Sequence, residues 1–318
     1  MSSSVEPAPP PLSGRVLWIG GSSGLALTFF EEVGLRCGET FVCTGAEQVQ
    51  PASLRRLSEE CEALDATDQR DPALQGARSR SLQYTKLDLT DAASVDMLFT
   101  HALPAIITRG DGGTASQIET LILGARAPLM SNDVAQHTAM LRHLGTLLDR
   151  AADHGVKRIL HISSVAAVNH LRAQRGESEE DPLPPLDEYQ GQAYDLYKRG
   201  CEDAITEACE RRGLRHVHVR LSAVFSNDPS CIQVNAIASM ARVGCYLPVL
   251  LDCNSSRNVC VALRLLLQRL EDEPERVRQV YYYTRPWGPP VPCTPPASPP
   301  PTCLLPACVP AVPCRALP

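Results

Sequence analysis

The sequence lacks a surplus of basic residues, a long apolar run and a secretory leader, and each absence removes a class of protein. Its formal net charge is −6 without any basic block, so the charge pattern gives no support for nucleic-acid binding. No apolar run approaches the ~18 residues of a membrane-spanning helix. The N-terminal MSSSVEPAPPPLSG has neither the basic nor the apolar part of a signal peptide, so we expect a disordered leader over residues 1–13 and a cytoplasmic protein.

The thirteen cysteines are scattered along the chain, and none forms a C-x-x-C pair. Cysteines at that spacing are typical of zinc sites and of thioredoxin-like redox centres, so we expect no metal site. In a chain without a secretory signal, these cysteines are expected to be reduced thiols.

Short apolar segments alternate with helical segments over residues 14–225. Segments typical of strands cover residues 15–21, 39–45, 81–91, 118–125, 156–164 and 215–225. Segments typical of helices cover residues 25–36, 92–103, 132–154 and 192–212. This alternation predicts an α/β protein with a Rossmann-type, doubly wound parallel sheet that forms a dinucleotide-binding domain.

The alternation weakens after Phe225, and a second, smaller part of the chain begins. Over residues 226–286 we expect a substrate-binding part, with a helix over 258–277 and a strand over 278–284 that returns to the sheet. In the last 32 residues, 287–318, twelve are proline and four are cysteine. Because proline cannot continue a helix or a central strand, this composition predicts a disordered tail.

A glycine turn, IGGSSGLAL, follows the first apolar segment and opens the first helix. Gly21 and Gly24 would permit a tight turn and a close approach of the backbone, and the helix N-terminus would offer N–H groups to a pyrophosphate. The third small position is Ala26 or Leu27, and a simple strand-to-helix turn is the alternative. The residues expected around the pyrophosphate are Gly21, Ser22, Ser23, Gly24 and Leu25.

The end of the second strand is expected to carry the group that reads the adenosine ribose. An acid there would accept hydrogen bonds from the 2′-hydroxyl and favour NAD. Thr44 stands at this place, and Glu47 is the first acid after it. Arg55 and Arg56 follow and could face a 2′-phosphate, so the cofactor is NAD(P), with NADP slightly favoured.

Further cofactor contacts are expected at the ends of the third and fourth strands. Asp88, in LDLTD, could accept a hydrogen bond from the adenine amino group, and Leu89 and Ala125 are expected beside it. Asp91 fits better as the cap of the following helix.

Two serines end the fifth apolar segment, RILHISS, at the edge where open α/β sheets build their sites. Thirty positions later, YDLYK places Tyr194 four residues before Lys198, so these two share one helix face. Together with the glycine turn, LDLTD and GVKRILHISS, this motif resembles the extended branch of the short-chain dehydrogenase/reductase superfamily over residues 15–284.

The resemblance implies a role for each residue of this set. Tyr194 would be the catalytic acid and base, and Lys198 would favour its ionised form and hold the nicotinamide ribose. Ser164 would donate a hydrogen bond to the substrate oxygen, with Ser163 as a second choice. Tyr197 would be a packing residue.

The long interval between Ser164 and Tyr194 and the segment 257–284 resemble the 3β-hydroxysteroid dehydrogenase-like family. This implies an NAD(P)-dependent oxidoreductase that interconverts a hydroxyl and a ketone on a hydrophobic, sterol-like substrate. A nucleotide-sugar epimerase is the first alternative, and Arg257 is its candidate diphosphate ligand. A non-catalytic dinucleotide-binding protein is the second, because the family's helix asparagine has only Asn132 as a match.

Three polar residues of the sixth strand are expected to be structural. His216 and His218 share one face without a third metal ligand nearby, so they are interpreted as ordinary strand residues. Arg220 would order the substrate loop. We expect a small-molecule substrate as the partner, and the sequence leaves a homodimer open.

Overall fold

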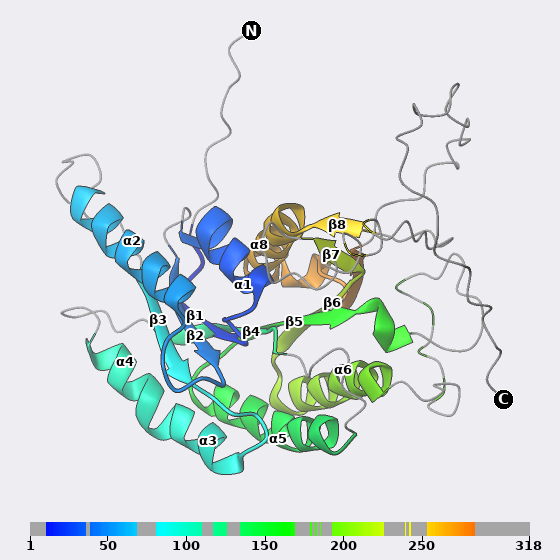
Figure 1. Ribbon diagram of the computed structural model, residues 1–318. Coiled ribbons are helices and arrows are strands. Elements are labelled where there is room, and N and C mark those ends of the chain that lie inside the picture. Colours follow the sequence, from blue (N-terminus) through cyan, green and yellow to red (C-terminus); the bar gives the residue numbers. More distant parts are fainter. Residues whose placement is uncertain are drawn as a thin grey trace, which may run out of the picture. The chain divides into compact units, whose positions relative to one another are not determined.

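The computed structural model describes residues 11–35, 39–68, 81–109, 117–125, 134–168, 193–225 and 253–283, with single residues at 179, 181, 183, 185, 239 and 242. Its main strands are β1 (Arg15–Ile19), β2 (Thr40–Gly45), β3 (Ser81–Lys86), β4 (Ile118–Leu123), β5 (Arg158–Ser164), β6 (Arg215–Leu221) and β9 (Val280–Tyr283). They form one sheet in the order β3-β2-β1-β4-β5-β6-β9, and every neighbouring pair is parallel (Figure 1). The expected Rossmann-type α/β fold is confirmed.

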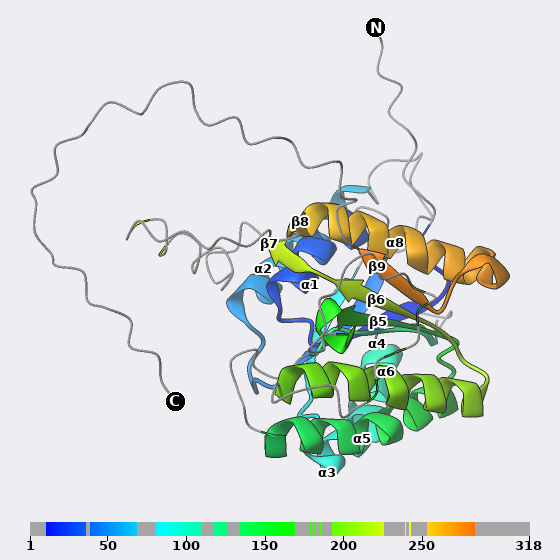
Figure 2. The ribbon, with the colours of Figure 1, turned by 90° about the vertical axis from the view of Figure 1, so that its right-hand side faces the viewer.

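Helices cover both faces of this sheet (Figures 1 and 2). One face carries α1 (Gly24–Phe29), α2 (Ala52–Asp68) and α8 (Ser256–Asp272). The other carries α3 (Ala92–Met97), α4 (Leu103–Arg109), α5 (Val134–Asp153) and α6 (Ala193–Arg212). Shorter helical turns span Phe30–Gly34, Leu98–Ala102, Val165–Val168 and Pro274–Arg276, and a small parallel sheet pairs β7 (Ala223–Phe225) with β8 (Cys253–Ser255).

The two apolar cores follow from the alternation of side chains along each strand. In β1, Val16 and Trp18 pack on the α1 side, where the Trp18 ring lies 5.0 Å from the ring of Phe29. Leu17 and Ile19 of the same strand pack on the α5 side. Because both faces are buried, the strand is apolar at every position from 16 to 19.

Most of the expected elements are present, but α2 and α4 were not assigned from the sequence and several boundaries differ. Among the described side chains of α2, the buried ones form a narrow face of Leu54, Leu57 and Cys61. The strand expected over 215–225 is divided into β6 and β7. The helix expected over 258–277 begins at Ser256 and ends at Asp272, two residues before Pro274, which cannot continue a helix.

Leu12 and Ser13, at the end of the expected leader, contact the folded domain. Leu12 is 1% exposed, and its N–H donates to both carboxylate oxygens of Glu39 at 3.2 Å. The N–H of Ser13 donates to Glu271 at 3.0 Å. These contacts tie residues 12 and 13 to the folded domain, which corrects the boundary at residue 13. Residues 1–10 of the expected leader lie outside the described residues, as do 226–252 of the expected substrate part (apart from 239 and 242), 284–286 and the tail over 287–318.

A buried ion pair joins the start of β2 to α8. Arg264 Nη2 lies 2.9 Å from Glu39 Oε1, and each residue is only 1% exposed. Burial raises the pKa of Glu39, against the opposing effect of the Arg264 guanidinium.

Within the described part of the chain, no helix is long and apolar enough to cross a membrane.

Removal of the Glu39 carboxylate should destabilise the fold strongly. Glu39→Ala leaves the buried Arg264 guanidinium without that carboxylate, so we expect a loss of about 3–5 kcal/mol in the free energy of unfolding. Glu60→Ala is the control, since Glu60 pairs with Arg56 on the surface and should cost less than about 1 kcal/mol. Urea unfolding measures both, and equal losses would contradict a buried role for Glu39.

Candidate active site

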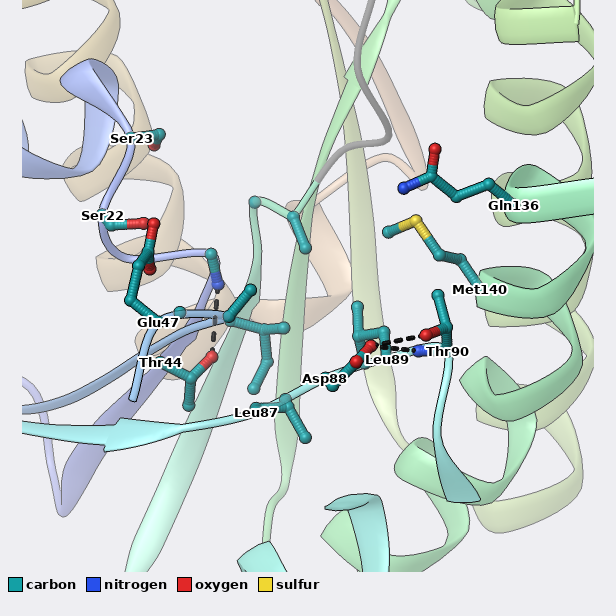
Figure 3. A pocket seen from close by; sticks show the side chains of 16 residues that line it. Ser22, Ser23, Thr44, Glu47, Leu87, Asp88, Leu89, Thr90, Gln136 and Met140 are labelled. Atoms are coloured by element: carbon teal, nitrogen blue, oxygen red, sulfur yellow. Dashed lines mark hydrogen bonds between the residues drawn. The ribbon is translucent and has the colours of Figure 1, made fainter. Parts of the chain in front are cut away.

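A cavity of about 310 Å³ lies at the carboxyl ends of β1 to β4 (Figure 3). This is where the strand order reverses direction, and open α/β sheets bind ligands at such a point. The cavity is lined by the glycine turn, by the loops after β2, β3 and β4, and by α5. Its residues are Ile19, Gly20, Ser22, Ser23, Thr44, Gly45, Ala46, Glu47, Leu87, Asp88, Leu89, Thr90, Gly124, Ala125, Gln136 and Met140.

The glycine turn uses its two adjacent glycines for different purposes. Gly20 has φ +83°, and a Cβ there would lie 2.6 Å from the Ala125 nitrogen, so only glycine fits. A Cβ on Gly21 would instead lie 2.4 Å from the Cβ of Cys43. Gly21 is therefore required for packing against β2, whereas Gly20 lines the cavity.

Thr44 holds the glycine turn against the end of β2. Its Oγ1 accepts a hydrogen bond from the Gly20 N–H at 3.3 Å, and its carbonyl accepts one from the Gly21 N–H at 2.8 Å. This role uses the Thr44 hydroxyl, one residue before the end of β2. Of the expected phosphate-binding residues, Ser22 and Ser23 line the cavity.

The start of α1 places the remaining residues of the turn. Ser23 caps the helix, and its Oγ accepts from the Ala26 N–H at 3.3 Å. Ala26 is completely buried, so it supplies the third small position. Leu25 packs against the core on the α8 side, and its carbonyl accepts from the Cys260 thiol, so it is not one of the cavity residues. Gly24 lines a neighbouring cavity.

The loop after β3 holds Asp88 in a defined conformation. Its Oδ1 accepts from the Thr90 N–H at 2.9 Å and from the Thr90 hydroxyl at 2.7 Å, and these hydrogen bonds lower the pKa of Asp88 (Figure 3). Asp91 accepts from the Ala93 N–H at 3.0 Å and caps α3, as expected. Leu89 and Ala125 lie in the cavity wall beside Asp88.

An acid, and not an arginine, faces this cavity from the loop after β2. Glu47 is a cavity residue (Figure 3). Arg56 lies in the neighbouring cavity, where it is 3.8 Å from Glu31 and 3.5 Å from Glu60. The side chain of Arg55 is exposed on α2. The described arginines thus give no support for binding of a 2′-phosphate in the cavity.

The expected catalytic residues come from the end of β5 and from the first turns of α6. Ser164 is the last residue of β5, and its Oγ accepts from the Ala166 N–H at 3.2 Å. Lys198 Nζ lies 6.0 Å from the centre of the Tyr194 ring and donates to the Ile162 carbonyl at 3.0 Å. The first turns of α6 are thereby held beside the strand that ends in Ser164.

Burial distinguishes the two tyrosines better than their distance from the lysine. Lys198 Nζ lies 5.9 Å from the Tyr197 ring, although adjacent helix positions were not expected to approach each other. Tyr197 is only 4% exposed, stacks on His137 at 5.2 Å, and has its pKa raised well above the usual value by burial. Its place in the core agrees with a packing role, whereas Tyr194 is partly exposed.

A buried carboxylate occupies the layer between α6 and the sheet. Glu202 accepts from the Ser163 hydroxyl at 2.5 Å and from Arg220 at 3.0 and 2.7 Å. Although burial opposes the effect, the hydrogen bonds from Arg220 lower the pKa of Glu202. Ser163 is thus engaged inside the fold, which leaves Ser164 as the catalytic candidate. Arg220, expected to order the substrate loop, belongs to this layer.

Two histidines of the same layer contact each other. His161 Nδ1 and His218 Nδ1 lie 3.0 Å apart, and His218 Nε2 lies 3.0 Å from the Thr206 hydroxyl. Burial lowers the pKa of His218 to about 4, and that of His161 well below its usual value. Among the described residues, no group of three or more His, Cys, Asp or Glu could hold a metal ion.

The sequence profile of the NAD dependent epimerase/dehydratase family matches residues 51–257, about two thirds of the chain. The first 50 residues, which include the glycine turn, lie outside this match. No curated protein sequence matches the chain.

In three of the solved structures that share this fold, the sequence identity to the chain is low. UDP-N-acetylglucosamine 4-epimerase from Bacillus cereus has a TM-score of 0.56 at 11% identity over 86% of this chain and 80% of that chain. WbmG from Bordetella bronchiseptica, in complex with NAD and UDP, has a TM-score of 0.59 at 15% identity over 86% of this chain and 73% of that chain. The terminal R domain from the myxalamid PKS-NRPS biosynthetic pathway has a TM-score of 0.62 at 17% identity over 88% of this chain and 68% of that chain.

The buried histidine pair predicts a loss of stability in acid. The unfolded chain takes up a proton on His218 near pH 6.5, whereas the folded protein does so only near pH 4. The unfolded state therefore binds more protons between these values, so the contribution of His218 is complete above about pH 6.5 and falls by about 3 kcal/mol towards pH 4.

Urea unfolding at several pH values tests this prediction. His218→Asn should flatten the dependence of the unfolding free energy on pH between 4 and 6.5, because the titrating group is removed. His101→Asn, on the surface of the helical turn before α4, is the control and should leave the slope unchanged. A slope that is the same in His218→Asn and the wild type would contradict the assignment.

Proposed function

The chain belongs to the NAD-dependent epimerase/dehydratase family, and we propose that it is an oxidoreductase that interconverts a hydroxyl and a ketone on a small molecule. The observation that carries this proposal is the hydrogen bond from Lys198 to the Ile162 carbonyl. It supports a site in which Tyr194 and Lys198 of α6 act together with Ser164 of β5.

The lining of the cavity at the glycine turn suits the adenosine and pyrophosphate part of a dinucleotide. Leu87, Leu89 and Met140 offer apolar surface for an adenine ring, and Asp88 offers a carboxylate at its edge. The N–H groups and hydroxyls of the turn, at Ser22 and Ser23, suit a pyrophosphate.

NAD is the better candidate than NADP, in contrast to the slight preference that the sequence alone suggested. The Glu47 carboxylate would accept hydrogen bonds from a ribose 2′-hydroxyl and repel a 2′-phosphate.

The residues at the end of β5 would carry the proton chemistry. When bound, NAD would supply the hydride acceptor, and its reduced form would supply the hydride donor for the reverse direction. Tyr194 would take the proton of the substrate hydroxyl as the ketone forms, and return it in the reverse direction. Ser164 would donate a hydrogen bond to the same substrate oxygen. Lys198, whose Nζ lies 6.0 Å from the centre of the Tyr194 ring, would hold the ribose hydroxyls.

A nucleotide sugar is the substrate class that the family and the structural neighbours favour. The neighbours include several epimerases of UDP-sugars. No described residue favours a sterol-like substrate over this class. Arg257 does not add support for a diphosphate ligand, because its Nε faces Glu32 at 3.5 Å in the neighbouring cavity.

Cofactor binding can be measured before any substrate is identified. Trp18 is buried in β1, one residue before the cavity wall, so bound NADH should quench its fluorescence by energy transfer. We expect NADH to bind at least about tenfold more tightly than NADPH, which corresponds to about 1.4 kcal/mol. Trp287→Phe removes the only other tryptophan and serves as the reporter background. Tighter binding of NADPH would contradict the role of Glu47.

The tyrosine assignment is tested by turnover of UDP-glucose and of a 3β-hydroxysteroid in parallel. Tyr194→Phe should reduce turnover by about 10²–10⁴-fold while NADH binding is kept, because only the proton-transferring hydroxyl is lost. Tyr197→Phe is the matched control and should retain most of the activity. Lys198→Met should impair both turnover and binding. Equal activity of wild type and Tyr194→Phe would contradict the role of Tyr194, whereas NADH binding without turnover in either protein would favour the non-catalytic binding protein.

A further inference from the structure

Three polar groups converge over the α-carbon of Gly45 at the end of β2. A Cβ placed there would lie 2.8 Å from Glu47 Oε2, 2.8 Å from the Tyr84 hydroxyl and 3.2 Å from the Ser22 hydroxyl. These groups come from the loop after β2, from β3 and from the glycine turn. The glycine thus leaves open the space in which they meet, at the wall of the dinucleotide cavity.

Tyr84 anchors the loop that carries Glu47. Its hydroxyl donates to the Glu47 carbonyl at 2.7 Å and lies 3.4 Å from Glu47 Oε2. The position of the ring is fixed independently, because Tyr84 pairs with Cys43 across β2 and β3 and packs against the core. Burial, together with the charge of Glu47, raises the pKa of Tyr84 to about 12, so the phenol stays a donor throughout the neutral range.

We propose that Tyr84 and Gly45 determine the choice of coenzyme by holding Glu47 in the position that reads the ribose. This inference rests on the proposed function, since it specifies how the NAD site distinguishes its ligands. Glu47 lies in an exposed loop and has a long side chain, so holding its carboxylate in one place carries an entropic cost. The bond from Tyr84 to the Glu47 backbone reduces that cost before the coenzyme arrives.

The effect of Tyr84→Phe on coenzyme binding should differ from the effect of removing a hydroxyl that only stabilises the fold. A structural role would change the binding of NADH and NADPH equally, since both coenzymes use the same cavity. A role through Glu47 changes their ratio, because the carboxylate accepts from a 2′-hydroxyl and repels a 2′-phosphate. The measured quantity is therefore the ratio of the two dissociation constants.

The test is equilibrium binding of NADH and NADPH, followed by Trp18 fluorescence in the full chain. Tyr84→Phe should weaken NADH by about five- to tenfold, the size of one hydrogen bond, and leave NADPH unchanged or tighter. Gly45→Ala should also reduce the preference for NADH over NADPH, because the added methyl group displaces the Glu47 carboxylate. Tyr281→Phe is the matched control, since that hydroxyl accepts from the Arg278 N–H on the opposite edge of the sheet, and it should leave the ratio unchanged.

A double-mutant comparison shows whether Tyr84 acts through Glu47. In a Glu47→Gln background, Tyr84→Phe should have no further effect on the ratio. A full effect in that background, or an equal loss for both coenzymes in Tyr84→Phe alone, overturns the inference. If the wild type prefers NADH and Tyr84→Phe does not change that preference, this inference is overturned and the proposed function stands. A wild type that binds neither coenzyme rejects the proposed function and this inference with it.

Discussion

The hydrogen bond from Lys198 to the Ile162 carbonyl is the contact on which the proposed site depends. It joins the first turns of α6 to the end of β5, which are separated by more than thirty residues in the sequence. One turn further along α6, Glu202 repeats this connection through Ser163 and reaches Arg220 on β6. The helix is thus fixed at two successive levels, and Tyr194 is placed by a helix that cannot slide along the sheet.

This attachment is polar, and polar burial is costly. A layer of Glu202, Arg220, His161 and His218 lies between α6 and the sheet, where the opposite face of the same strands is apolar. A buried ion pair is often no more stable than the apolar side chains that could replace it. Directional bonds, however, fix the helix in one register, whereas apolar contacts allow it to shift. The geometry of the Tyr194 hydroxyl is what such a layer would preserve.

The sequence predicted the order of strands and helices well, because apolar periodicity reflects burial on both faces of a parallel sheet. It did not reveal α2, whose few apolar residues are separated by charged ones. Nor could it decide between adjacent glycines: Gly20 takes the left-handed conformation and Gly21 packs on Cys43, a difference that depends on β2.

Other residues of the site were hidden for a similar reason. Tyr84 has the composition of an ordinary strand residue, and its bond to Glu47 exists only because β2 and β3 are neighbours. Glu202 had one signal in the sequence, its position four residues after Lys198 on the same helix face. Local patterns therefore located the catalytic candidates, while the groups that hold them depend on contacts between distant segments.

The central claim is that hydride transfer takes place at the end of β5 with Tyr194 as the proton carrier. The most direct measurement mixes excess protein with NAD and a nucleotide sugar in a single turnover and follows the near-ultraviolet absorbance of reduced nicotinamide. We expect this absorbance to appear in the wild type and to be absent in Tyr194→Phe. Its appearance at the same rate in both proteins would show that Tyr194 does not carry the proton.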